Sequence, residues 1–432
     1  MRLLSSFIRG GTSALNAIWS APAVLFSAFL IAWGAEAAQF MMSQGLALAI
    51  LAWLQTLPEF AVEAKLAWDA GRGTPADVHL VTANFTGSIR LIMGFGMPMV
   101  YFIRTRFWSR SRTLKPIELD AFHSVEIVSL FPPIIYFVWI LHKGTLDLVD
   151  SIVLLGFYAL YLGLLMRMPP EEEGDLSELP AVSRWVLKRG RLGRVLGVIF
   201  IFVLGGGILF LTVHEFIESL KAIAPMVGLS AFFFIQWVAP FMSEMPEKVS
   251  AFTWASKEKR APMALMNFLS SNLNQLTVLV AMVPIVFALS AWMAGATPPE
   301  AQPADLGPTI HFNHAQWSEV LLTVTQAALC LVLLLNMKFE WMEAVGMFVL
   351  FFIQFLSPVW AKLIGLNEAQ TEVWNEQFRL WVSIVYLAWI ALEVVLVLTR
   401  ARRWQFPMLA RPSRAIFARR TMGPPPAAGP KS

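Results

Sequence analysis

Long apolar segments recur along the whole chain, and each is long enough to cross a lipid bilayer. A hydrocarbon core of about 30 Å needs roughly 20 mostly apolar residues per helix. On that basis we predict eleven membrane spans, at 20–38, 45–70, 77–103, 120–142, 145–168, 194–213, 224–256, 262–293, 315–337, 339–363 and 376–399. The sequence is 57% hydrophobic and 14% charged, whereas soluble domains are about a quarter charged. No strand alternation is evident, so we expect an all-α, polytopic transmembrane helical bundle.

Lysine and arginine fall in alternate connections between the predicted spans. They gather in 104–115, 184–194, 257–260 and the tail from Arg400 to Lys431, whereas 294–314 and 364–375 contain none. Because positive residues favour the cytoplasmic side, we predict the N-terminus outside and the C-terminus in the cytoplasm. Arg2 and Arg9 disagree mildly with this orientation. Short loops and the lack of a large regulatory domain favour a multi-pass protein of a bacterial inner (plasma) membrane.

The start of the chain allows a second interpretation. Arg2, Arg9, the apolar run 21–34 and Ala35-Glu36-Ala37 resemble a cleavable signal peptide. Cleavage would place every basic connection on the wrong face of the membrane. We therefore expect the first span to be retained, with cleavage as the alternative.

Five regions are predicted along the chain. They are an N-terminal repeat of five spans (1–168), a cytoplasmic linker (169–193), a second five-span repeat (194–363), an extra transmembrane helix (364–400) and a basic, disordered tail (401–432). The expected partners are the lipid bilayer and inorganic cations, with no nucleic acid; the oligomeric state is left open. The single cysteine, Cys330, excludes an internal disulfide.

Internal repetition is the most informative feature for function. The second predicted span contains Gln55-Thr56-Leu57-Pro58-Glu59, and the seventh contains Ser243-Glu244-Met245-Pro246-Glu247. The helix after each carries matching polar residues, Asn84 and Ser88 in one and Asn267, Ser271 and Gln275 in the other. Five spans separate the two copies, so matching helices run in opposite directions. The pattern predicts two inverted five-helix repeats, as in many secondary transporters.

Each Pro-Glu pair has a chemical consequence at the middle of a membrane span. A carboxylate at that depth must face the protein interior or water. Proline breaks the helical hydrogen bonding and frees backbone carbonyls, which need a partner in lipid. Together these groups form an all-oxygen environment of the kind that hard cations prefer. One such pair alone could be a kinked helix with an interfacial acid, and the polar helices alone could be packing glue. Two matched pairs favour a shared ion site.

These motifs resemble the sodium/calcium exchanger (cation/calcium exchanger) superfamily. That family carries two alpha-repeats, each with a Gly-Thr-Ser-x-Pro-Glu segment and a Gly-Asn-x-x-Gly-Ser-Asn segment. The second segment is matched here by 83–88 and by 267–272, and the resemblance covers residues 20–363. It implies exchange of Ca²⁺ or a related cation against Na⁺, H⁺ or K⁺ by alternating access. It implies no enzymatic activity and no cofactor beyond the transported cations.

The resemblance also assigns roles to individual residues. It makes Glu59 and Glu247 the central carboxylate ligands of the metal. Nearby oxygen atoms would come from Gln55, Thr56, Ser243 and Glu244, with Ser88 and Ser271 completing the site from the following helices. Asn84, Asn267 and Gln275 are the remaining candidates for lining the cation site.

Several positions depart from the family pattern. Ile92 and the neutral Gln275 stand where an asparagine or acid is usual, Glu244 stands where a serine is usual, and Lys248 follows Glu247. Arg90 would lie about 200° around the helix from Ser88. It is either a charge partner of the cation site or, as we expect, paired with Glu36 or Glu126.

Other residues and functional classes were considered. His79 and His214 lie near the predicted membrane edge, where they could relay protons. The alternative to an antiporter is a transport-inactive scaffold or a membrane-embedded enzyme on the same fold. An enzyme would need a nucleophile or a metal-histidine set near the two acids, and the sequence offers none.

Overall fold

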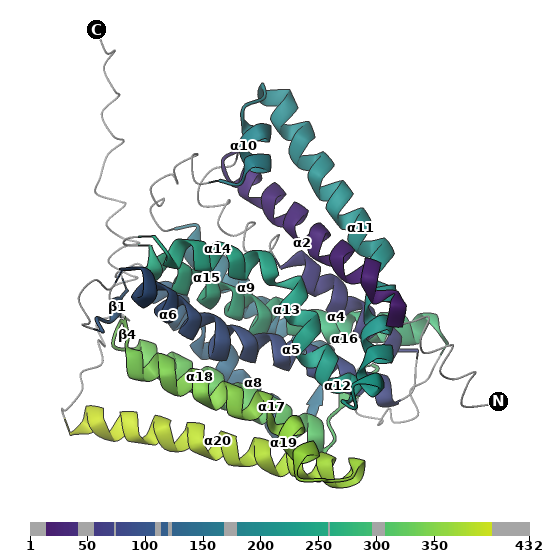
Figure 1. Ribbon diagram of the computed structural model, residues 1–432, viewed down its shortest axis with the longest axis vertical. Helices are drawn as coiled ribbons and strands as arrows, with labels where there is room; N and C mark the ends of the chain where they lie inside the picture. The colour runs from purple at the N-terminus through teal and green to yellow at the C-terminus, as the bar shows by residue number, and fades with distance from the viewer. Residues whose placement is uncertain are drawn as a thin grey trace.

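The structure is a computed structural model, and it describes residues 14–41, 56–72, 75–108, 114–119, 123–167, 179–257, 260–295 and 307–399. Helices dominate these residues, which confirms the all-α prediction (Figure 1). The helices of the first half are α2 (Ala17–Gln39), α4 (Leu57–Ala70), α5 (Pro75–Leu91), η1 (Ile92–Gly96, a π-helix), α6 (Met97–Trp108), α7 (Ser124–Ser129), α8 (Phe131–Lys143) and α9 (Leu148–Leu165).

The second half begins with α10 (Ala181–Leu187) and α11 (Arg191–Met226). It continues with α12 (Ala231–Phe233), η4 (Phe234–Val238), α13 (Ala239–Ser243), α14 (Met245–Ala255), α15 (Ala261–Asn274), η5 (Gln275–Leu279) and α16 (Val280–Met293). The last helices are α17 (His314–Leu334), α18 (Trp341–Phe355), α19 (Ser357–Leu363) and α20 (Glu368–Leu398).

Among the described residues, eight helices are long and apolar enough to cross a membrane, or nine if α18 and α19, bent by 48°, form one span. The predicted second span is described only from Thr56 onward, and the predicted seventh is interrupted at Glu244 between α13 and α14. The sixth span was predicted too short: α11 runs over 36 residues, because apolar residues continue to Met226 beyond the polar interruption at His214. The count of eleven therefore stays a prediction.

Two short antiparallel strand pairs join connections that are far apart in sequence. β1 (Ile117–Glu118) pairs with β4 (Lys338–Phe339), and β2 (Thr145–Leu146) pairs with β3 (Ile310–His311). The predicted topology places both members of each pair on the same side of the membrane, so the pairing agrees with the alternation of spans. Which side faces the cytoplasm stays a prediction.

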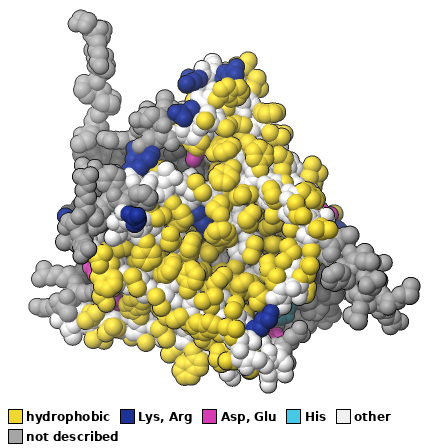
Figure 2. Space-filling model, viewed as in Figure 1, with side chains coloured by type: hydrophobic (Ala, Val, Ile, Leu, Met, Phe, Trp, Pro, Cys, Tyr) yellow, Lys and Arg dark blue, Asp and Glu magenta, His cyan; other side chains and the backbone are white. Residues whose placement is uncertain are grey.

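The outer surface is strongly apolar. Figure 2 shows hydrophobic side chains covering most of one face, with basic side chains at its ends. The long helices α11 and α20 contribute many of the exposed apolar residues, among them Phe200, Phe210, Leu211, Trp381 and Leu392. Such a surface is stable only against lipid tails.

Part of the expected linker is ordered. Within 169–193, residues 179–193 are described and include helix α10, which packs against α2 beside α11 (Figure 1). The Ser183 hydroxyl donates to the Trp33 carbonyl at 2.9 Å. Apolar contacts of Val186 and Leu187 explain the difference, because they bury one face of this helix. The predicted tail, 401–432, lies outside the described residues.

Candidate cation site

Both Pro-Glu motifs lie in the first turn of a helix. Pro58 lies in the first turn of α4 and Pro246 in the first turn of α14. Proline is tolerated there, because the first N–H groups of a helix have no intrahelical acceptor. Glu59 and Glu247 follow in the same first turns, where the helix dipole favours negative charge. Both side chains are buried.

The first-repeat acid meets residues of the second repeat. The Ser88 hydroxyl of α5 lies within hydrogen-bonding distance of both the Glu59 and the Glu244 carboxylates. Gln275 Nε2 lies 2.9 Å from Glu59 Oε2, 2.7 Å from Ser88 Oγ and 3.0 Å from Glu244 Oε1. Two residues that departed from the family pattern, Glu244 and Gln275, therefore connect the repeats.

The second-repeat acid has matching contacts. Ser271 Oγ donates to Glu247 Oε2 at 2.9 Å, as Ser88 does to Glu59. Asn267 Nδ2 donates to Glu247 Oε1 at 3.2 Å. The carboxylates of Glu244 and Glu247 repel that of Glu59, which places all three within electrostatic range of one another.

A buried lysine offsets part of this negative charge. Lys248 is 1% exposed, and its ammonium group pairs with the Glu244 carboxylate one turn earlier. With all groups ionised, Glu59, Glu244 and Glu247 contribute −3 and Lys248 contributes +1, a formal sum of −2. Lys248 thus lies within the cluster and does not extend to the membrane surface.

A fourth buried carboxylate was missed by sequence reasoning. Glu63 is fully buried on α4 and accepts a hydrogen bond from Asn84 Nδ2. It lies four residues after Glu59, which puts both acids on one face of the helix, and this spacing could have revealed it. Asn84, predicted to line the site, therefore contacts Glu63 rather than Glu59.

Several buried oxygen atoms in and around the cluster have no hydrogen-bond partner among the described residues. They are Glu63 Oε1, Asn84 Oδ1, Asn274 Oδ1 and Gln275 Oε1. Asn274 also donates from Nδ2 to Thr56 Oγ1 at 2.6 Å, which ties α15 to the start of α4. Buried polar atoms without a protein partner usually interact with water or an ion.

Each repeat carries a π-helix at the same place. The π-helix η1 begins at Ile92, four residues after Ser88, and η5 begins at Gln275, four residues after Ser271. Single π-turns within α-helices occur frequently at functional sites. Only the second copy has a polar residue at this position, because Ile92 is a buried apolar side chain.

Three predicted residues are placed elsewhere or not described. Ser243 is buried, but its hydroxyl donates within its own helix to the Ala239 carbonyl at 3.1 Å. Gln55 lies outside the described residues. Arg90 faces away from Ser88 as expected, but the predicted partners are wrong: it pairs with Glu319 and neither with Glu36 nor with Glu126. Glu319 belongs to α17, and helix neighbours this distant cannot be inferred from spacing along one helix.

The two candidate relay histidines lie away from the cluster. His79 lies within 2.9 Å of Asn313 Nδ2. His214 groups with Asp69 and Glu218, whose ligand atoms all lie within 4.8 Å of one another. Both of these acids already pair with lysines, Lys65 and Lys221.

Comparison with known proteins gives a consistent result. The chain matches the family described as sodium/calcium exchanger protein over residues 12–167 and 197–360. It is similar to the H⁺/Ca²⁺ exchanger CAX, at 28% identity and a TM-score of 0.75, over 94% of this chain and 92% of that chain. A match to the sodium-calcium exchanger NCX_Mj has 15% identity and a TM-score of 0.48, over 83% and 99% of the two chains. No curated protein sequence matched.

The fold defines a polytopic membrane transporter of the inverted-repeat class. The chain belongs to the sodium/calcium exchanger family, whose members are cation antiporters. The family match begins at residue 12 and includes α2. This helix is therefore part of the matched region.

Proposed function

We propose that this protein is a Ca²⁺/H⁺ antiporter that works by alternating access. Glu59, Glu244 and Glu247 bind either one Ca²⁺ or protons. The similarity to an H⁺/Ca²⁺ exchanger over 94% of the chain supports the choice of ions. The surrounding oxygen atoms support the choice of a hard cation, because Ca²⁺ takes six to eight oxygen ligands. Gln275 donates to Glu59, and the preceding residue, Asn274, donates to Thr56 at the start of α4.

The junction at Ser88 is the observation that carries the proposal. Ser88 Oγ contacts the carboxylates of Glu59 and Glu244 and the amide of Gln275, so acids from both repeats meet at one hydroxyl. Carboxylates that share one small polar site can be occupied either by protons or by a hard divalent cation, which is what exchange of H⁺ for Ca²⁺ requires.

The charge of the cluster sets the exchange ratio. The formal sum of −2 for three carboxylates and Lys248 is balanced either by one Ca²⁺ or by two protons. Exchange of one Ca²⁺ for two protons leaves the summed charge of these four groups at zero in both states; Glu63, which accepts from Asn84, is not counted in this sum. The balance matters because an uncompensated charge costs several kcal/mol in the membrane interior.

The proposal is tested with purified protein in liposomes. A pH gradient should drive ⁴⁵Ca²⁺ uptake with Na⁺ absent, and both Glu59→Gln and Glu247→Gln should abolish it. The matched control is Glu218→Gln, which removes a 40% exposed carboxylate and should leave uptake unchanged. Uptake that requires Na⁺, or that survives in Glu59→Gln, would contradict the proposal.

A further inference from the structure

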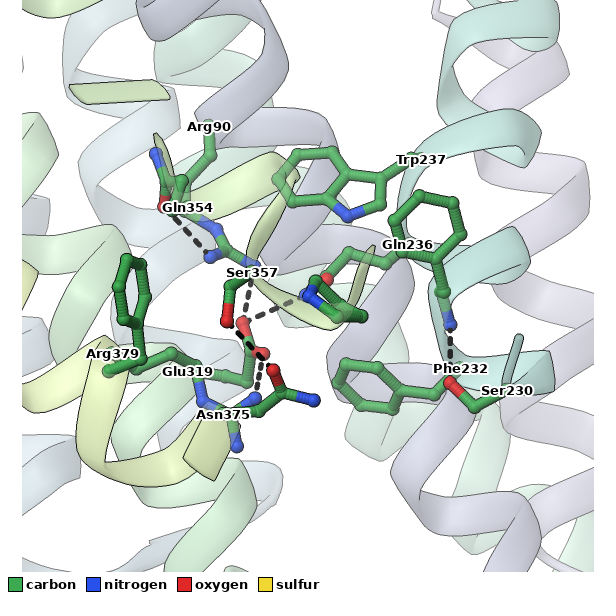
Figure 3. Close-up of a pocket in the computed structure, with 13 residues that line it drawn as sticks. Arg90, Ser230, Phe232, Gln236, Trp237, Glu319, Gln354, Ser357, Asn375 and Arg379 are labelled. Atoms are coloured by element: carbon green, nitrogen blue, oxygen red, sulfur yellow. Dashed lines mark hydrogen bonds and ion pairs between the residues drawn. The ribbon is translucent and has the colours of Figure 1, made fainter. Parts of the chain in front are cut away.

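A second polar cluster lies in the bundle, and its charge has the opposite sign. Glu319 of α17 is bridged by two arginines: Arg90 of α5 pairs with Oε2, and Arg379 Nη1 of α20 lies 2.9 Å from Oε1 (Figure 3). Gln236 Nε2 also donates to Oε2 at 2.8 Å. Arg90 and Glu319 are 2% and 1% exposed. We refer to Arg90, Glu319 and Arg379 as the arginine cluster.

This cluster borders a cavity of about 40 Å³, room for a few water molecules or one small ion. Its walls are the aromatic residues Phe232, Phe233, Trp237 and Phe378 together with the polar residues Ser230, Gln236, Ser357 and Asn375. Arg90 and Arg379 are the two cations of the lining, and Glu319 is its one carboxylate, so the lining has a formal charge of +1. Such an excess charge in a partly buried cavity favours a counter-ion.

Hydrogen-bond donors remain available at the cavity. Arg379 donates from Nε to Ser318 Oγ, and its Nη1 forms an ion pair with Glu319 Oε1. Among the described residues, none pairs with its Nη2. Asn375 accepts from Ser357 Oγ at 2.8 Å, and its Nδ2 has no partner in the described part of the chain. Asn375 and Arg379 lie four residues apart on α20 and so share a face of that helix, and Figure 3 draws both with Glu319 in the cavity lining.

We propose that this cavity is an accessory binding site for a small monovalent inorganic anion such as chloride, held between Arg379 and Asn375. A cation would be repelled by the positive lining, and water would leave the charge uncompensated. Arg379 gives the route of entry, because its side chain is 13% exposed, far more than Arg90. The bound anion completes the junction of α20 with α5, η4 and α17.

The test uses full-length protein purified in detergent, with its melting temperature followed as choline chloride replaces choline gluconate at constant ionic strength. Chloride should raise the melting temperature along a saturable curve. Arg379→Gln removes the excess positive charge and should raise the half-saturating chloride concentration roughly tenfold or more. Glu319→Gln makes the lining more positive and should lower that concentration. The control is Lys362→Gln, an exposed cation outside the cavity lining, which should change nothing.

Two further measurements can still test the proposal if a charge variant fails to fold. Asn375→Ala removes one donor without changing charge and should raise the half-saturating concentration several-fold. Crystals grown in bromide should show an anomalous scattering peak between Arg379 and Asn375. Three results would each overturn the proposal. They are no chloride effect in the unmodified protein, a half-saturating chloride concentration in Asn375→Ala and Arg379→Gln equal to that of the unmodified protein, and bromide located elsewhere. These outcomes do not depend on transport and leave the proposed antiport untouched.

Discussion

The carboxylate cluster (Glu59, Glu244 and Glu247) and the arginine cluster have buried charges of opposite sign. Around Glu59, Glu244 and Glu247 the formal charge with Lys248 is −2, and nearby amide oxygens have no partner among the described residues. Around Glu319 the formal charge is +1, and the carboxylate is enclosed by two arginines and a glutamine. The first arrangement leaves its acids able to exchange ligands. The second fixes its acid between helices, so burial alone does not identify a transport residue.

One helix serves both clusters. Ser88 and Arg90 lie two residues apart on α5 and face different sides of the helix. The neighbouring Gly87 is where α5 packs directly against η4. A Cβ atom on Gly87 would lie 1.9 Å from the Gln236 carbonyl oxygen, so only glycine allows this contact. Close packing here brings Gln236 to Glu319 while keeping Ser88 on the carboxylate side.

The largest effect on stability should come from breaking the arginine cluster. Arg90→Met leaves Glu319 with one arginine and removes the stacking of Arg90 over Trp237, whose centroid lies 5.0 Å away. Removing one partner of a buried ion pair costs about 3–5 kcal/mol. We expect a markedly lower melting temperature of the purified protein. Replacing all three charged residues together, as Arg90→Met, Glu319→Met and Arg379→Met, should recover much of the loss, because no unpaired charge is then left in the bundle. If Arg90→Met is as stable as the parent protein, the comparison fails.

The next effect concerns the charge of the carboxylate cluster. Lys248→Gln changes its formal sum from −2 to −3, so one Ca²⁺ should exchange for three protons and each cycle should move net charge. One charge across 100 mV is worth about 2.3 kcal/mol, or roughly a 50-fold change in the final Ca²⁺ gradient. Uptake by the parent protein should be insensitive to an imposed potential, whereas uptake by the variant should respond. Lys65→Gln, which alters a pair outside the cluster, is the control.

The smallest effect is expected at an exposed ion pair. Lys338 donates to Glu118 at 2.8 Å across β1 and β4, and this hydrogen bond lowers the pKa of Glu118 below its ordinary value of 4.5. A lowered folded-state pKa stabilises the protein above the ordinary pKa, and this contribution is lost as the pH falls through the folded-state value. Exposed pairs contribute at most about 1 kcal/mol. Lys338→Ala should therefore alter melting only slightly, and only above that acidic range; a loss as large as that of Arg90→Met would contradict it.

Sequence patterns predicted the residues of the carboxylate cluster better than the contacts between them. Matched Pro-Glu motifs identified Glu59 and Glu247, and helical spacing identified Ser88 and Ser271. The roles of these residues in binding cations remain a proposal. Gln275 was counted as a departure from the family pattern, yet it contacts Glu59 of the first repeat and Glu244 of the second.

The arginine cluster could not have been predicted in the same way. Helical geometry showed that Arg90 points away from Ser88, but its partner lies 229 positions later in the chain. The third member comes from α20, which has no counterpart in the other repeat. Repeat symmetry therefore gave no guide to this pairing, and nearby acids such as Glu36 and Glu126 were reasonable but wrong choices.

The two strand pairs have a mechanical consequence for α17. This helix starts just after β3 and ends just before β4, and both strands pair with connections of the first half. It is thus held at both ends by backbone hydrogen bonds to connections of the first half. We therefore expect the proposed opening of the carboxylates to alternate sides to move helices without such pairings more than α17.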